Sequence, residues 1–184
     1  MEALNDRSVV DRFVRLEVES DIDNVDENGW DSIFPESTGL KYNVLRLFQN
    51  SGVNDLKCHY VSMMSNDDFV GKANIYETEM DFTSMDSTMP PPIKDMVKEW
   101  HPNFLLLSMV ECGLFAMNGD GFVCGEKDAS PAIISVADYM EKVAADNGQD
   151  LVVFRDVPFD KYDLYESTLK ERGYLPCAGF TNAV

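Results

Sequence analysis

Basic residues are scarce in this sequence. It has 15 lysines and arginines against 33 acidic residues, which gives a formal net charge of −18. Such a charge repels the phosphate backbone of nucleic acids and the headgroups of anionic membranes, so we expect neither free nucleic acid nor membrane as a partner. The excess of acid is typical of a solubilising surface, and an acidic binding face is the alternative.

Cysteine is also rare, and no C-x-x-C pair occurs. The four cysteines Cys58, Cys112, Cys124 and Cys177 are widely separated, which excludes a dense disulfide scaffold and a paired-cysteine zinc site. No apolar run approaches the ~20 residues that span a bilayer. The N-terminus lacks the basic and then apolar order of a signal peptide. We therefore predict a cytoplasmic protein.

Several common cofactor and catalytic motifs are missing. The chain has no P-loop, no dinucleotide-binding glycine pattern and no nucleophile elbow. Its two histidines, His59 and His101, lie far apart without cysteines near them, so His59 is interpreted as structural. The acidic segment 24–35 is close to a calcium loop, but Pro35 occupies the position of the bidentate glutamate. We expect no metal.

The clearest pattern that is present covers residues 149–177. Leu151–Phe154 is a short apolar run, which predicts a strand buried on both faces. An amphipathic helical pattern follows Asp160. Gly173 is expected to end this helix in the left-handed conformation, and Tyr174 to begin another strand.

The remaining elements alternate in type along the chain. Apolar patterning predicts five further strands at Val9–Val18, Lys57–Met64, Phe69–Tyr76, Asn103–Val110 and Phe122–Cys124. Three further helices are expected at Tyr42–Gln49, at Ile93–Trp100, and from Pro131 to Asn147 after Ser130 as N-cap. Residues 77–92 show no periodicity and are predicted to form a long loop. This order predicts an α/β (α+β) fold, with a central mixed sheet and helices on both sides.

A family resemblance rests on the C-terminal patterns. The segments LLLSMVECGLF and GFVCGEKDASPAIISVADYMEKVAADNGQDLVVFRDVPFDKYDLYESTLKERGYLPC resemble the acyltransferase fold of the GNAT superfamily. More narrowly, they are similar to FemAB-like relatives and to relatives of the peptidogalycan-biosynthesis type. The firm part of the resemblance runs from Leu105 to Cys177. It implies that residues 1–184 form a single GNAT-like domain, or the N-terminal half of a longer two-domain protein.

The resemblance implies transfer of an acyl or aminoacyl group to a primary amine of a small molecule or peptide. Glu111 ends a predicted strand where this superfamily places a carboxylate that accepts the amine proton, and Tyr165 is the candidate general acid. The plainer alternatives are a solvent-facing carboxylate at Glu111 and a core tyrosine at Tyr165. Both alternatives remain open at this point.

Three further residues are candidates for substrate binding. Arg155 and Asp156 directly follow a predicted strand, and Cys112 follows Glu111. Arg155 and Asp156 are expected to hold a polar group of the acceptor, or else to pair with neighbouring helix ends. Cys112 has no basic partner nearby in sequence, so core packing is the alternative for it.

The resemblance also implies acyl-CoA as cofactor. However, the segment between Glu111 and Ser130 lacks the glycine turn whose backbone N–H groups bind pyrophosphate. Glu126 and Asp128 would stand where phosphates are expected. The second hypothesis is therefore a non-catalytic GNAT-like half that serves as a binding or scaffolding module and packs against a second domain or a protein partner.

Overall fold

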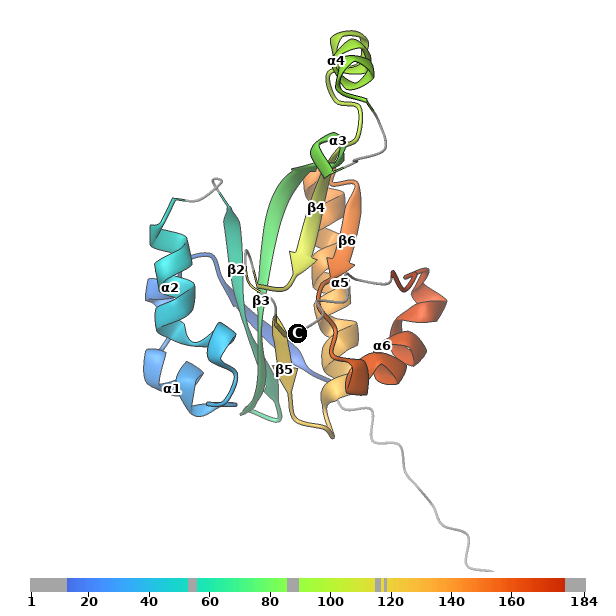
Figure 1. The fold of residues 1–184 in the computed structure, drawn as a ribbon. Helices are drawn as coiled ribbons and strands as arrows, with labels where there is room; N and C mark the ends of the chain where they lie inside the picture. The colour runs from blue at the N-terminus through green and yellow to red at the C-terminus, as the bar shows by residue number, and fades with distance from the viewer. Residues whose placement is uncertain (1–12, 53–55, 86–89, 115–116, 118, 178–184) are drawn as a thin grey trace, which may run out of the picture.

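The centre of the molecule is a six-stranded mixed sheet with helices on both faces (Figure 1). The structure is a computed structural model, which describes residues 13–52, 56–85, 90–114, 117 and 119–177. The strands are β1 (Arg15–Glu19), β2 (Lys57–Ser65), β3 (Asp68–Asp81), β4 (Leu106–Cys112), β5 (Phe122–Cys124) and β6 (Leu151–Phe154). The α-helices are α1 (Glu27–Ser32), α2 (Tyr42–Asn50), α3 (Phe82–Met85), α4 (Pro91–Trp100), α5 (Ala129–Asn147) and α6 (Tyr162–Leu169). Short 3₁₀ turns are η1 (Ile22–Asn24), η2 (Thr38–Leu40), η4 (Phe159–Lys161) and η5 (Lys170–Arg172).

The long strand β3 organises the sheet, whose order is β1-β2-β3-β4-β6. All pairs are antiparallel except β4 with β6, which is parallel. Two strands share one edge of β3: β4 pairs with its C-terminal part from Ile75, and β5 pairs with Gly71 to Ala73. Asn74 therefore lies where β4 ends and β5 begins.

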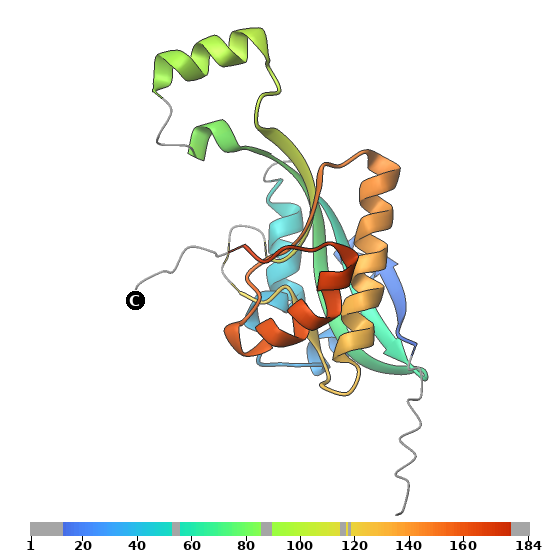
Figure 2. The same ribbon diagram turned by 90° about the vertical axis from the view of Figure 1, so that its right-hand side faces the viewer.

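One face of the sheet is covered by α5 and α6 (Figure 2). The apolar stripe of α5 packs on the sheet, and Ile133, Val136 and Met140 are completely buried. The helix ends at Gly148, whose φ of 66° is in the left-handed region that glycine adopts without strain. This helix and the residues it covers make the larger hydrophobic core.

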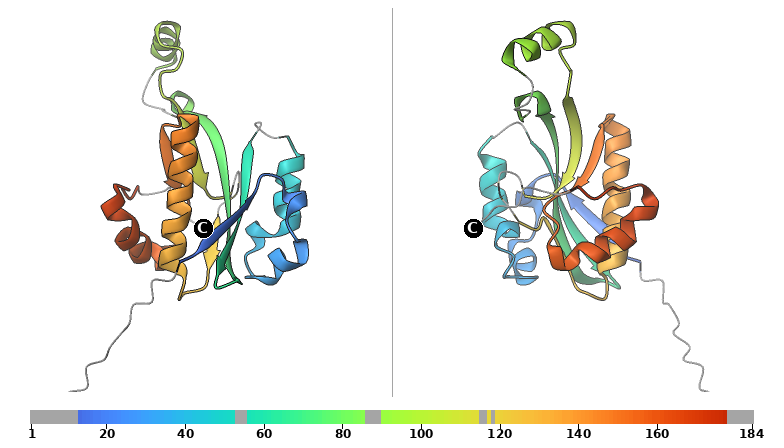
Figure 3. Two further views of the ribbon diagram at one scale, coloured as in Figure 1. Left: turned by 180° about the vertical axis from the view of Figure 1, so that it is seen from behind. Right: turned by 45° about the vertical axis from the view of Figure 1, so that its right-hand side comes forward.

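The other face carries the shorter helices α1 and α2 with their connecting turns (Figure 3). Trp30 is the centre of this second core and is 1% exposed. Its indole nitrogen donates a hydrogen bond to the Leu40 carbonyl at 2.6 Å, and its ring packs against Phe69. The two cores thus lie on opposite faces of the same sheet.

Helix α4 stands apart from the rest of the fold (Figures 1 and 2). Its two lysines hold it to the end of β3 and to α3: Lys98 pairs with Asp81, and Lys94 donates to the Thr83 carbonyl at 2.5 Å. The apolar side of α4 is exposed instead, at Ile93, Met96 and Trp100. In the usual amphipathic surface helix the apolar face is buried and the charged face is exposed, which is the reverse of α4.

Asp81, the carboxylate that pairs with Lys98 of α4, is expected to titrate at unusually low pH. Hydrogen bonds from Lys98 and then Thr83 lower the pKa of Asp81 from 3.8 to about 2. The stabilising contribution of this carboxylate is therefore complete above its unfolded pKa and is lost as the pH falls through about 2. We expect a carbon-detected NMR titration to show Asp81 ionised down to this range. Lys98→Met should raise the pKa of Asp81 toward its ordinary value. An unchanged titration midpoint of Asp81 in that variant would exclude Lys98 as the cause of the low pKa.

The expected fold class is confirmed at this level, and most elements lie where the patterns predicted them. The loop predicted for residues 77–92 is wrong, because β3 continues to Asp81 beside β4 and the chain then forms α3. Strand β6 ends the sheet and leaves Leu151 41% exposed, so it is not buried on both faces. Tyr174 begins no strand, and Asp128 instead of Ser130 is the N-cap of α5. The first predicted strand, Val9–Val18, overlaps β1, and its part before Phe13 lies outside the described residues.

Candidate functional site

A buried tyrosine and a buried glutamate face each other across β3 and β4. Tyr76 and Glu111 are paired in register, and the Tyr76 hydroxyl donates to Glu111 Oε2 at 2.5 Å. Both residues are almost completely buried. Burial, together with the hydrogen bond to Glu111, raises the pKa of Tyr76 well above its ordinary value. The phenol therefore stays protonated at neutral pH and is the donor to the carboxylate.

The arginine that directly follows β6 joins this pair. The Arg155 amide donates to the Cys112 carbonyl at 2.9 Å, which extends the β4–β6 pairing by one residue. Its guanidinium Nη1 donates to the Tyr76 hydroxyl at 3.2 Å and lies 3.7 Å from Glu111 Oε2. Its Nε lies 3.4 Å from Asp156 Oδ2. We call Tyr76, Glu111, Arg155 and Asp156 the Tyr76 cluster.

Asn74 borders this cluster on the same face of β3. Its amide nitrogen donates to the Gly113 carbonyl at 2.9 Å, while its side-chain oxygen is buried without a hydrogen-bond partner. The Asn74 amide donates to the Gly121 carbonyl, and the Asn74 carbonyl accepts from the Gly113 amide. Buried acceptors without partners are costly, about 1–3 kcal/mol each. The oxygen thus marks a place beside the cluster where a donor would be stabilising.

The Tyr76 cluster combines opposite charges with unequal access to solvent. The Glu111 side chain is 5% exposed, whereas that of Arg155 is 34% exposed. Within the described residues, the contacts of Arg155 use Nη1 and Nε, which leaves Nη2 for a further acceptor. A guanidinium binds carboxylates and phosphates through paired N–H donors. The arrangement is therefore suited to a ligand with an acidic group at Arg155 and a donor group toward Glu111 or Asn74.

The structure brings three of the five predicted site residues together: Glu111, Arg155 and Asp156. Cys112 is adjacent to Glu111 in sequence but points to the other face, because successive side chains of a strand alternate. It is buried in the larger core, where its thiol contacts the Gly121 carbonyl. Burial, and secondarily Asp120, raises the pKa of the Cys112 thiol. It therefore remains a neutral core residue.

Tyr165 also lies in the larger core, away from Glu111. Its ring makes edge contacts with Phe122 and Phe154, with centroids 6.1 and 5.5 Å away. Burial raises the pKa of Tyr165 far above its ordinary value. The structure thus places this predicted general acid within an aromatic cluster and on the face opposite the Tyr76 cluster.

Two residues of the site, Tyr76 and Asn74, were missed by the sequence patterns. Both lie in a predicted strand, but which strand would pair with β3, and in which register, could not be inferred. The alternation of that strand did indicate that positions 74 and 76 share a face. Only the pairing of β3 with β4 places Tyr76 opposite Glu111.

Comparison with known proteins gives one kind of match. Two proteins of Mycobacterium tuberculosis, from strains CDC 1551/Oshkosh and ATCC 25618/H37Rv, are each 32% identical to this chain over 146 residues. Both are named "Putative 8-amino-7-oxononanoate synthase 2". The match covers 78% of this chain but 19% of each relative. No protein family profile matches the chain, and no solved structure does.

These relatives overturn two expectations. An N-acyltransferase of GNAT or FemAB-like type acting on a primary amine is wrong, because the relatives carry the name of a different acyltransferase, a synthase. The non-catalytic GNAT-like half is withdrawn with it. Acyl-CoA as cofactor is wrong as well, because that synthase depends on pyridoxal phosphate.

The buried lysine of the structure does not fit pyridoxal phosphate. This cofactor requires an accessible lysine for its Schiff base and a partner for its ring nitrogen. Lys72 is the one fully buried lysine in the part of the chain that the structure describes. Its ammonium donates to the Trp30 carbonyl at 2.9 Å and lies 5.5 Å from the centre of the Trp30 ring. This lysine is thus enclosed by the smaller core and is not accessible for a Schiff base.

Proposed function

We propose that this chain is a substrate-binding domain of a synthase-type acyltransferase, the kind of enzyme for which its curated relatives are named. In this proposal the Tyr76 cluster binds a ligand that carries both an amino group and a carboxylate. The observation that supports it most is the buried Glu111 carboxylate held beside the half-exposed Arg155 guanidinium.

The charges of the cluster suit the two ends of an amino acid or amino-keto acid. Arg155 offers its free edge to the ligand carboxylate, and hydrogen bonds of this charged kind contribute about 1.5–3 kcal/mol. Glu111 accepts from an ammonium group, and the unpaired side-chain oxygen of Asn74 is a second acceptor nearby. Tyr76 links Glu111 and Arg155 and holds their side chains in place.

In this proposal the acyl-transfer chemistry belongs to the parts of the relatives that the match does not cover. The relatives are about five times the length of the matched segment, since that segment is 19% of them. The enclosed position of Lys72 also supports placing the acyl-transfer chemistry outside this chain. A GNAT-type fold stays a prediction about architecture alone, independent of this activity.

Ligand binding tests the proposal directly. We expect 8-amino-7-oxononanoate, at a hundred times its Kd, to stabilise the protein by about 2.7 kcal/mol in thermal unfolding. The amine-free 7-oxononanoate and the methyl ester of the amino-keto acid should each stabilise it less, because each lacks one of the two charges. Equal effects from all three compounds, or none from the first, would contradict the proposal.

Substitutions within the cluster separate the two ends of the ligand. Arg155→Met should weaken binding of the amino-keto acid about 10- to 100-fold, and the methyl ester should be insensitive to this change. Glu111→Gln should remove the preference for the amine-bearing compound. Arg46→Met is the control, because Arg46 also pairs with a carboxylate, that of Asp23, at a half-exposed site outside the cluster. Isothermal calorimetry of each variant measures these differences.

A further inference from the structure

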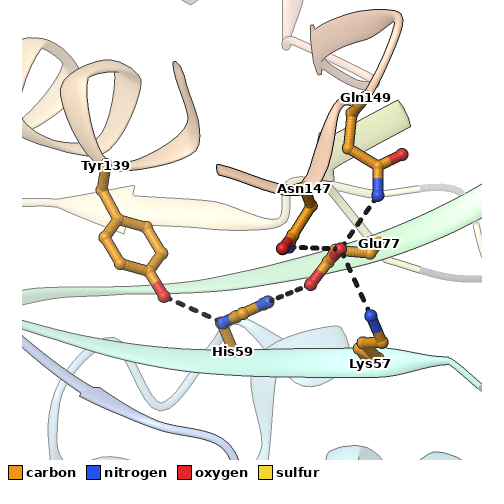
Figure 4. Close-up of polar contacts among 6 residues, drawn as sticks. All are labelled: Lys57, His59, Glu77, Tyr139, Asn147 and Gln149. Carbon is orange, nitrogen blue, oxygen red and sulfur yellow. Dashed lines mark hydrogen bonds and ion pairs between the residues drawn. The ribbon is translucent and has the colours of Figure 1, made fainter. Parts of the chain in front are cut away.

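A second polar network lies on the α5 face of the sheet, opposite the Tyr76 cluster (Figure 4). Its centre is His59 of β2, between Tyr139 of α5 and Glu77 of β3. The Tyr139 hydroxyl lies 2.8 Å from His59 Nδ1, and His59 Nε2 lies 3.3 Å from Glu77 Oε1. The sequence patterns had indicated a structural role for His59 and had not connected these three residues.

The sheet register explains why His59 and Glu77 meet. His59 pairs with Ile75, and Glu77 pairs with Lys57, so the two side chains are diagonal neighbours on one face. Tyr139 reaches this diagonal from the helix above and makes an edge contact with the imidazole, with ring centroids 5.8 Å apart. The arrangement therefore joins residues separated by up to 80 positions in sequence.

The carboxylate of Glu77 decides which nitrogen of His59 carries the proton. An ionised carboxylate only accepts hydrogen bonds, so Nε2 of the neutral ring is the donor and Nδ1 is left as an acceptor for the Tyr139 hydroxyl. Glu77 is itself held from its other oxygen by the amides of Asn147 and Gln149, both at 2.9 Å. Lys57 lies 3.8 Å from the same oxygen.

We propose that Tyr139, His59 and Glu77 act as nucleophile, general base and orienting carboxylate, so that Tyr139 accepts acyl groups from activated esters. Hydroxyl, imidazole and carboxylate occur here in the same order of hydrogen bonds as in hydrolase triads, with a phenol as the nucleophile. Tyr139 is only partly buried, and the His59 side chain is 16% exposed. Both residues are therefore partly accessible, and the Tyr139 hydroxyl points toward His59 (Figure 4).

The environment of Tyr139 requires such a base. Burial raises the pKa of Tyr139, and the charge of Glu77 adds to the effect. The phenol is therefore protonated at neutral pH, like the serine of a hydrolase, and does not react as a preformed phenolate. Removal of its proton in the transition state by His59 is worth about 10²–10⁴ in rate.

The reaction balances without an oxidant or reductant. With p-nitrophenyl acetate, the Tyr139 oxygen bonds to the carbonyl carbon while its proton moves to His59 Nδ1. The adduct then expels p-nitrophenolate, which leaves an acetyl ester on Tyr139, and the proton of His59 passes to solvent. Water, with His59 again as base, hydrolyses that ester to acetate and regenerates the phenol. The Glu77 carboxylate stabilises the transient imidazolium through Nε2.

Tyr162 provides an internal control in the same molecule. Its side chain is more accessible, at 38% exposure of the residue, and it lies on α6, away from this network. Simple accessibility would make Tyr162 the faster to react. We expect mass spectrometry of p-nitrophenyl acetate-treated protein to find acetylation of Tyr139 at least about 100-fold faster. Equal or slower labelling of Tyr139 would overturn the proposal.

Variants assign the roles of the other two residues. Tyr139→Phe should abolish the burst of p-nitrophenolate, and His59→Gln should slow labelling of Tyr139 about 100-fold without affecting Tyr162. Unchanged labelling in His59→Gln would show a purely structural network. Circular dichroism verifies the fold of each variant. If a variant does not fold, the relative labelling rates of Tyr139 and Tyr162 in the unmodified protein still test the proposal. The test is independent of the proposed function, because the network and the Tyr76 cluster lie on opposite faces.

Discussion

Trp30→Ala is expected to lower the free energy of unfolding by about 3–5 kcal/mol, as the removal of a large buried aromatic side chain does. Trp30 is 1% exposed and fills the centre of the smaller core. The substitution also leaves the Leu40 carbonyl without its indole donor. In addition, the buried Lys72 ammonium loses the aromatic face above which it lies. Urea unfolding followed by circular dichroism measures the change.

The other tryptophan of the chain is the control for this prediction. Trp100 is 77% exposed on α4, so Trp100→Ala removes the same side chain from a site with little burial. We expect this variant to lie within about 0.5 kcal/mol of the parent protein. Similar losses in the two variants would contradict the assignment of Trp30 to a tightly packed core.

Gly121→Ala is expected to be nearly as damaging, at about 3 kcal/mol. A Cβ at this position would lie 2.3 Å from the Gly113 Cα and 2.5 Å from its backbone nitrogen and carbonyl carbon. No side-chain rotation relieves a clash between two backbones, so the segments that leave β4 and enter β5 must separate. The hydrogen bond from the Asn74 amide to the Gly121 carbonyl is then strained as well. Chemical denaturation gives the loss, and the NMR shift of the Asn74 amide locates it.

Gly125→Ala is the matched substitution for Gly121→Ala. The nearest atom to its new methyl group would be the Val70 carbonyl oxygen at 3.9 Å, an ordinary contact. Gly125 is not among the glycines with positive φ. We therefore expect a change below about 1 kcal/mol. A loss below about 1 kcal/mol in Gly121→Ala too would show that the close approach to Gly113 relaxes easily.

The two polar networks lie on opposite faces of one sheet. Tyr76 and Glu77 are consecutive in β3 and therefore point to opposite faces. Tyr76 joins Glu111 and Arg155, whereas Glu77 joins His59 and Tyr139. Among the described residues, the two networks share no contact. The proposed ligand-binding role of one and the proposed nucleophilic role of the other can therefore be tested separately, by substitutions at the adjacent positions Tyr76 and Glu77.

Local patterns were sufficient for most of the secondary structure. The periodicity of α5, the glycine that ends it and the polar turn between β2 and β3 are each encoded within a few residues. They also indicated which side chains alternate across a strand. The pattern was misleading at residues 77–81, where polar residues form a strand because β4 supplies its hydrogen-bonding partner.

The sequence by itself determined the class of fold, the strong acidity and the grouping of Arg155 and Asp156 after a strand. Only the tertiary structure decided which side chains meet, because the order and register of strands depend on contacts between distant segments. Glu111 was predicted, but its partner Tyr76 is 35 residues away and becomes its neighbour only across paired strands. His59, Glu77 and Tyr139 come from β2, β3 and α5, and only the packing of that helix on the sheet brings them into one network.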